Sequence, residues 1–211
     1  MFDEFINSLA QQLKNALPGE ESQQKMAPAK RPGTQFMLKS NPNPRNGSVL
    51  ILFYPSEGKI FLPLILRPAY DGNHSGQVSF PGGEFEKSDQ TLDKTALREA
   101  KEEVGIDTGK VKLIGNLTEL YIPVSNFLVH PFVGHTSEKP VFNPDEKEVE
   151  SLLQIPLDDF LDERNRFSKP MHFKTLGGTM DTPYFHIQEQ TIWGATAMMM
   201  SELCEIISGI K

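Results

Sequence analysis

The sequence predicts an α/β fold in which a β-sheet packs against α-helices, and three observations support this prediction. Short aliphatic runs of strand length recur along the chain between turn residues. A segment with apolar residues at helical spacing, 92–104, interrupts these runs. Further helical patterns stand near both ends of the chain. Strands and helices mixed in this order favour a layered α/β sandwich, and 211 residues are enough to bury one such core.

The N-terminal region predicts an amphipathic helix and a connecting segment. The pattern ends at Pro18-Gly19, and its apolar residues are Phe2, Phe5, Ile6, Leu9, Leu13 and Leu17. Such a helix docks on the core, pairs two subunits of a homodimer or touches a membrane. Docking is favoured because the polar face is poor in Lys and Arg. Residues 18–47 are rich in Pro, Gly, Gln and Asn, so we expect little regular structure there. We divide the chain into an extension, 1–46, and a main domain, 47–211.

The middle of the chain predicts a series of strands. They span residues 48–54, 59–67, 78–80, 111–121, 127–134 and 151–157, with a turn at 55–58. Pro63 lies inside the second run, which indicates an edge or bulged strand. The remaining elements are a short acidic helix at 158–163, two short strands at 171–175 and 184–187 flanking Gly177-Gly178, and a closing helix at 193–207.

The helix expected over residues 92–104 has one apolar face. That face carries Leu92, Ala96, Leu97, Ala100 and Val104. Asp89 or Ser88 can cap its start, and Gly105 can end it. We therefore expect a helix packed on the core, with its acidic side chains facing outward.

Three of these acids, Glu99, Glu102 and Glu103, stand at positions i, i+3 and i+4, so they share one patch although their like charges repel. A cation is expected among them, and ligands that are all oxygen favour Mg²⁺ or Mn²⁺ over zinc or copper. Upstream, Pro81-Gly82-Gly83 predicts a tight turn where the backbone can approach a ligand. A solvated helix face is the alternative for the glutamates alone. The adjacent glycine turn favours a metal site.

At these residues the chain resembles the Nudix hydrolase family, whose signature is G-x5-E-x7-R-E-U-x-E-E-x-G-U, with U aliphatic. The matching positions are Gly83, Arg98, Glu99, Ala100, Glu102, Glu103, Gly105 and Ile106. Asp89 stands in place of the first glutamate, and its separation from Arg98 is one residue longer than in the signature. The resemblance covers about residues 47–160 and implies the Nudix fold, a mixed β-sheet sandwiched between α-helices.

A subgroup of the family that cleaves coenzyme A departs from the signature in the same two ways, and this chain looks similar to that subgroup. Its further pattern, L-L-T-x-R-[SA]-x3-R-x3-G-x3-F-P-G-G, is met at Leu64, Arg67, Gly76 and Phe80-Pro81-Gly82-Gly83 but not at Ile65, Pro68 and Gly72. The resemblance implies hydrolysis of a diphosphate linkage in coenzyme A or an acyl-CoA, giving 4'-phosphopantetheine and adenosine 3',5'-bisphosphate. ADP-ribose, dinucleotides and nucleoside triphosphates are alternative substrates. A non-catalytic nucleotide-binding module is the alternative from another class.

The resemblance also implies roles for individual residues. Glu99, Glu102 and Glu103 would be metal ligands, with the Gly83 carbonyl as another, and Arg98 would orient the acids through an ion pair. Glu102, Glu103 and Arg98 are thus candidate catalytic residues as well.

A base for the attacking water is harder to place. The acidic segment 143–149 predicts a loop just ahead of a strand, and Glu148 in this loop is our candidate. The helix glutamates and a merely solvated charge run are the alternatives. The five histidines show no metal-ligand spacing, and a loop or structural role is expected for His74.

Composition limits the partners and the compartment. A formal net charge of -7 argues against binding to nucleic acid, which needs clustered Lys and Arg. No secretory signal opens the chain and no run is long enough to span a bilayer, so we expect a cytoplasmic protein without a membrane partner. Cys204 is the only cysteine, which excludes an internal disulfide and favours a small buried side chain.

Overall fold

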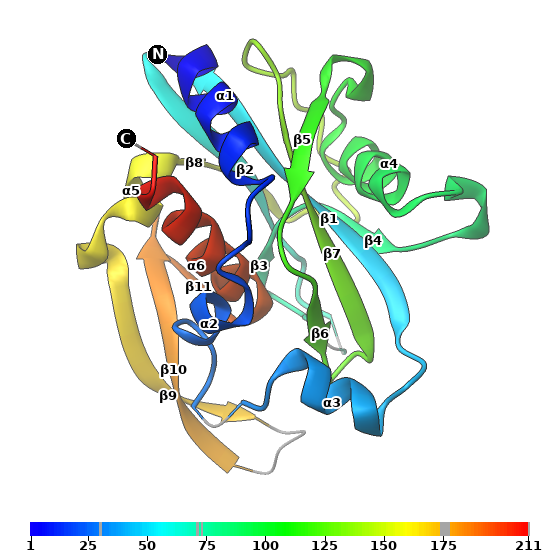
Figure 1. The fold of residues 1–211 in the computed structure, drawn as a ribbon. Coiled ribbons are helices and arrows are strands. Elements are labelled where there is room, and N and C mark those ends of the chain that lie inside the picture. The colour runs from blue at the N-terminus through cyan, green and yellow to red at the C-terminus, as the bar shows by residue number, and fades with distance from the viewer. Residues whose placement is uncertain (30, 71, 73, 174–177, 211) are drawn as a thin grey trace.

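The larger of two β-sheets separates two groups of helices (Figure 1). This computed structural model describes residues 1–29, 31–70, 72, 74–173 and 178–210. The larger sheet has the order β3-β2-β1-β7-β5, with β4 paired to β1, β6 to β7 and β8 to β2. Its strands are β1 (Arg45–Ser56), β2 (Lys59–Leu66), β3 (Val78–Ser79), β4 (Gly82–Glu84), β5 (Lys112–Asn116), β6 (Leu120–Ile122), β7 (Phe127–His135) and β8 (Ser151–Pro156). The smaller sheet has the order β11-β10-β9, from β9 (Arg166–Phe173), β10 (Gly178–Ile187) and β11 (Gln190–Trp193).

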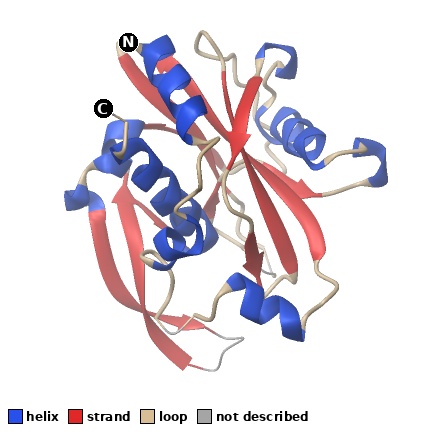
Figure 2. Ribbon diagram, viewed as in Figure 1, coloured by secondary structure: helices blue, strands red, loops and turns tan. Residues whose placement is uncertain are grey.

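Helices lie on both sides of the larger sheet, as Figure 2 shows with helices in blue and strands in red. The α-helices are α1 (Phe2–Gln12), α2 (Gly19–Gln24), α3 (Thr34–Ser40), α4 (Leu92–Val104), α5 (Leu157–Leu161) and α6 (Gly194–Ser208). Short 3-10 turns are η1 (Lys87–Asp89), η2 (Thr108–Lys110) and η3 (Glu163–Asn165). Because β1 runs parallel to β7 and antiparallel to β2 and β4, the sheet is mixed. The predicted α/β class, a mixed sheet between helices, is confirmed.

Strand β1 divides the core into two clusters because its side chains alternate between the faces of the sheet. Leu50 and Leu52 pack on one face with the apolar stripe of α4. Ile51 and Phe53 pack on the other face with α1 and α6. The strand is therefore apolar on both sides, which explains its uninterrupted aliphatic run.

The proline of β2 lies where that strand has a hydrogen-bonded neighbour on one side only. Pro63 pairs with Gln154 of β8, whereas the pairing with β1 ends at Phe61 and the pairing with β3 begins at Ile65. The missing N–H of proline is tolerated at such a position. The expectation of an edge strand is wrong for the run as a whole, because β2 lies between β3 and β1 in the sheet, and only the stretch around Pro63 has a partner on one side alone.

The N-terminal helix docks on the core, as expected. Ile6 and Leu9 of α1 are buried in the cluster that also contains α6. The prediction of little regular structure over 18–47 is wrong, because α2 and α3 lie within this segment. For α2, a contact distant in sequence contributes: Gln23 donates a 2.9 Å hydrogen bond to the fully buried carboxylate of Glu202 on α6.

Other predicted elements differ in their bounds. The single strand expected over 111–121 is divided into β5 and β6, separated by residues 117–119. The strands expected at 171–175 and 184–187 are longer and extend to β9 and β10, although Thr175 and Gly177 lie outside the described residues. The closing helix begins one residue later than expected, because Trp193 ends β11. Within the described part of the chain, no helix has both the length and the apolar character needed to cross a membrane.

Candidate active site

Helix α4 places the acidic residues, and its two ends follow local rules. Gly105 ends the helix in the left-handed conformation (φ +68°), as its position in the sequence indicated. The expected cap is wrong, because Thr91 and neither Ser88 nor Asp89 occupies the N-cap position. Asp89 instead ends η1, where its carboxylate accepts a 2.9 Å hydrogen bond from the hydroxyl of Thr95.

The acidic side chains of α4 do not all face outward, so that expectation is also wrong. Glu103 is 1% exposed, and the side chain of Glu99 is 14% exposed, compared with 53% for Glu102. Glu99 and Glu103 are one helical turn apart and face the glycine turn at β4, whereas Glu102 is rotated from Glu103 by about 100°. Two of the three glutamates therefore stand in a low-dielectric environment.

Both carboxylate oxygens of Glu103 are hydrogen-bonded. Oε2 accepts the backbone N–H of Gly82 at 2.8 Å, and Oε1 accepts Arg67 Nη2 at 3.1 Å. Burial raises the pKa of Glu103 to about 7, against the attraction of Arg67 and the Gly82 N–H, and the charges of Glu99 and Glu148 raise it further. Glu103 thus ties the C-terminal half of α4 to the glycine turn.

Arg98 is surrounded by carboxylates on three sides. Its guanidinium donates to Asp89 at 2.7 and 3.0 Å, and Nη1 lies 2.8 Å from both Glu99 and Glu102. Nη2 also donates to the carbonyl of Glu84 at 2.9 Å. The hydrogen bond to Asp89 is the main reason that the pKa of Arg98 is raised, and the same bond holds the pKa of Asp89 well below its usual range. The predicted ion pair between Arg98 and the acids is present.

The residues fit a hard divalent cation by several criteria. A side chain at Gly83 would collide with the Glu99 carboxylate, so the glycine makes room for that group. Burial raises the pKa of Glu99; the charge of Arg98 lowers it, and the negative charges of Glu102 and Glu148 raise it further. A bound cation would relieve the repulsion between these three carboxylates. Ser48 pairs with Gly83 in the sheet and is 1% exposed, and its hydroxyl is a buried group without a hydrogen-bond partner among the described residues.

The donor set consists of oxygen atoms, which suits Mg²⁺ or Mn²⁺. In the described residues, however, no three His, Cys, Asp or Glu side chains stand together in an arrangement ready to hold a metal. The guanidinium of Arg98 lies between Glu99 and Glu102 and supplies the positive charge there. A metal would share these two carboxylates with Arg98.

The loop that carries Glu148 is attached to the end of α4. Asn143 N donates to the carbonyl of Val104 at 2.9 Å, and Asp145 N donates to the carbonyl of Glu103 at 3.1 Å. Glu148 itself is exposed. Its charge acts on both buried glutamates of α4, which places it on the same side of the molecule as the acidic group.

Arg67 belongs to the site, although its place in the sequence predicts no role there. Its Nη2 contacts the carbonyl of Gly82 at 3.0 Å as well as Glu103, and its Nε donates to the Ser79 hydroxyl at 3.2 Å. The signal in the sequence was the match of Arg67 to the coenzyme A subgroup pattern. His74 in the following loop is hydrogen-bonded to Gln77 and Ser125, which agrees with a structural role.

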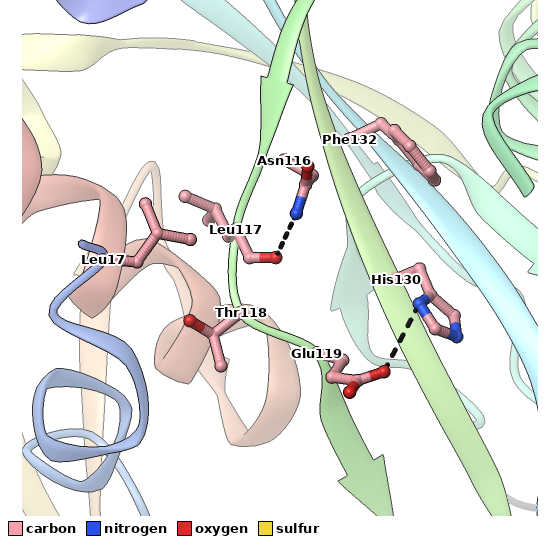
Figure 3. Close-up of a pocket in the computed structure, with 7 residues that line it drawn as sticks. All are labelled: Leu17, Asn116, Leu117, Thr118, Glu119, His130 and Phe132. Atoms are coloured by element: carbon pink, nitrogen blue, oxygen red, sulfur yellow. Dashed lines mark hydrogen bonds and ion pairs between the residues drawn. The ribbon is translucent and has the colours of Figure 1, made fainter. Parts of the chain in front are cut away.

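A hollow of about 420 Å³ lies at the edge of the larger sheet, beside the link between the end of β5 and the start of β6. Figure 3 shows the residues that line it: Leu17, Asn116, Leu117, Thr118, Glu119, His130 and Phe132. The carboxylate of Glu119 lies 3.6 Å from His130, whose Nε2 is 3.2 Å from the side chain of Asn46 on β1. Burial lowers the pKa of His130, and the neighbouring Glu119 opposes this shift.

One wall of the hollow, His130, is close to the glycine turn that faces the glutamates of α4. His130 and Gly83 both pair with Ser48, one on each side of β1. Because neighbouring strands are about 4.8 Å apart, the backbones of His130 and Gly83 are about 10 Å apart. Phe132 packs with the core cluster of α4, whereas Leu117 and Leu17 pack with the cluster of α1 and α6, so the hollow extends around the edge of the sheet from one face to the other.

Comparison with known proteins agrees with this geometry. Residues 44–174 match the family model of the NUDIX domain. An uncharacterized Nudix hydrolase, NudL, from Pectobacterium atrosepticum is 37% identical over 147 residues, which cover 70% of this chain and 75% of that protein. NudL from Yersinia enterocolitica is 34% identical over 160 residues, which cover 71% of this chain and 80% of that protein.

Among solved structures, the crystal structure of RenU, a Nudix hydrolase from M. smegmatis, aligns with a TM-score of 0.56. It is 15% identical and covers 79% of this chain and 88% of its own, so it supports the fold alone. The match to the family model and the sequence relatives together show that this chain belongs to the Nudix hydrolase family.

Proposed function

We propose that this Nudix hydrolase cleaves the diphosphate linkage of coenzyme A or an acyl-CoA into 4'-phosphopantetheine and adenosine 3',5'-bisphosphate, in the cytoplasm. The family accounts for the coarser statement, hydrolysis of a nucleoside diphosphate derivative. The observation that favours coenzyme A is the role of Arg67 and the glycine turn. These residues match the pattern of the coenzyme A subgroup, and they contact Glu103 directly.

The metal in this proposal is Mg²⁺ or Mn²⁺, which when bound would offset charge on the phosphoryl oxygens and lower the pKa of the attacking water. Glu99 and Glu102 would hold it, because their carboxylates converge on one point now served by Arg98 Nη1. The carbonyl of Gly83 and the second lone pair of Glu103 Oε1 complete the proposed donor set.

The protein groups position this site before a substrate arrives. Asp89 fixes the guanidinium of Arg98, which in turn orients Glu99 and Glu102. Glu103 fixes the glycine turn through the N–H of Gly82. In phosphoryl transfer such positioning and electrostatics supply most of the rate enhancement.

Glu148 is the proposed base. It is exposed, so it can reach a water, and its loop is held at the end of α4 by backbone hydrogen bonds. We expect Glu148→Gln to lower kcat by about 10²-fold or more with KM little changed. Glu146→Gln, an exposed acid two residues away in the same loop, is the matched control and should keep the wild-type rate. A loss of less than a few-fold in Glu148→Gln would assign the proton transfer to a helix glutamate.

The substrate is tested by incubating the purified protein and Mg²⁺ with coenzyme A, ADP-ribose, NADH and nucleoside triphosphates, with products resolved by mass. We expect the two named products from coenzyme A at the highest kcat/KM. Cleavage of ADP-ribose with coenzyme A left intact would overturn the proposed substrate. Tight nucleotide binding without any cleavage product would favour a non-catalytic binding module.

A further inference from the structure

The hollow between β5 and β6 combines an apolar wall with a negative charge that has no permanent counterion there. Leu17, Leu117 and Phe132 supply the apolar surface, and Glu119 supplies the charge. No Lys or Arg lines the hollow among the residues described. The only ionisable group beside Glu119 is His130, and burial favours its neutral form. A phosphate would therefore meet repulsion here, whereas an uncharged group with amide or hydroxyl hydrogens would find acceptors.

The walls of the hollow are held in place by one buried carboxylate. Glu202 of α6 accepts hydrogen bonds from the backbone N–H of Gly19 at 3.2 Å, two residues after Leu17. It also accepts from Thr118, through the hydroxyl at 2.6 Å and the backbone N–H at 3.2 Å. Leu17 and Thr118 thus line a pre-formed site, and Leu17 comes from the extension that precedes the family-matched residues.

We propose that this hollow binds the uncharged pantetheine arm of the substrate, so that Leu17, Asn116 and Glu119 determine specificity. The inference rests on the proposed cleavage of coenzyme A and deepens it. The arm begins at the scissile diphosphate, and His130, the wall of the hollow nearest to the glycine turn, lies about 10 Å from that turn across β1. Amide N–H and hydroxyl groups of the arm donate to Glu119 and Asn116, and its aliphatic part contacts Leu17 and Phe132. The charged adenosine bisphosphate stays outside the hollow.

The test uses pantetheine, which carries no phosphate, and adenosine 3',5'-bisphosphate as separate probes of the full-length protein. Each is titrated without metal while backbone amide chemical shifts are followed by NMR. Pantetheine is expected to bind saturably and to shift the amides of residues 116–119. Leu17→Ala should weaken its binding by about fivefold, because part of an apolar contact is lost. Glu119→Gln should also weaken it, while neither variant changes the affinity for the bisphosphate.

Phe36→Ala, at an exposed apolar residue of the same extension, and Glu57→Gln, at an exposed turn, are the matched controls and should behave like wild type. Glu119→Gln is isosteric, so it tests the inference even if Leu17→Ala folds poorly. The inference is overturned if pantetheine shifts no amides of this hollow, or if the variants weaken the bisphosphate and spare pantetheine. Pantetheine bound in the hollow of a protein that cleaves ADP-ribose but not coenzyme A would overturn the proposed substrate and leave the pocket assignment standing.

Discussion

Replacing Glu103 with glutamine should change how the stability of the metal-free protein depends on pH. The carboxyl has a pKa of about 7 in the folded protein, compared with the ordinary value of 4.5. Between these values the folded protein holds a proton that the unfolded chain releases. The stabilisation from this group is therefore fully present below pH 4.5 and is lost as the pH rises through about 7.

The shift from 4.5 to about 7 corresponds to about 3 kcal/mol, most of which is lost between pH 5 and pH 8. Glutamine does not titrate, so Glu103→Gln should lose about 2–3 kcal/mol less than wild type over this interval. At pH 5 the variant should differ from wild type by about 1 kcal/mol or less, because the protonated carboxyl of Glu103, like the amide of glutamine, must place a hydrogen against either the Gly82 N–H or Arg67.

Urea unfolding in EDTA, followed by the fluorescence of Trp193, the only tryptophan, gives the free energy of unfolding at both pH values. Glu102→Gln is the matched control, since that carboxylate is exposed and should leave the wild-type slope unchanged. If wild type and Glu103→Gln lose the same stability between pH 5 and pH 8, Glu103 is ionised throughout in the folded protein. Burial would then not raise the pKa of this carboxyl.

Three further predictions concern the surrounding residues. Gly83→Ala should lower activity by at least tenfold with little change in melting temperature, because the added Cβ displaces the Glu99 carboxylate, which can move. Gly82→Ala should instead lower the melting temperature by several degrees, because the added Cβ collides with the backbone of β1. Asp89→Asn should cost about 2 kcal/mol in urea unfolding at pH 7 and lower kcat, since a charged hydrogen-bond acceptor for Arg98 is lost. Glu202→Ala should cost about 3–5 kcal/mol and expose the first 30 residues to limited proteolysis, because it leaves several buried donors without an acceptor.

Elements marked by local periodicity could be predicted from the sequence. The apolar stripe of α4 and the glycine after it determine the helix and its end, because both effects act within a few residues. The presence of the acids was equally visible. Their orientation was not, because an i, i+3, i+4 cluster is typical of solvated helix faces. Glu103 is buried only because Arg67 and the Gly82 N–H, 36 and 21 residues away, satisfy its oxygens.

The N-terminal extension shows the same limit. Its composition indicated a connecting segment, yet α2 is held by a glutamate 179 residues away in the chain. Nothing in the local pattern around Gln23 or Glu202 indicates this contact. The link Leu117–Glu119 was read as part of one strand for the same reason, since its exit from the sheet depends on bonds between Thr118 and Glu202. Sites formed by distant segments, such as the hollow that includes Leu17, require the fold.

Binding of Mn²⁺ measured by isothermal titration tests the central claim, that the carboxylates of α4 hold the metal. Wild type should bind Mn²⁺ saturably in the presence of adenosine 3',5'-bisphosphate. The double variant Glu99→Gln/Glu102→Gln should bind at least tenfold more weakly, while Glu146→Gln on the neighbouring loop matches wild type. Equal Mn²⁺ affinity in the wild type and the double variant would contradict the account.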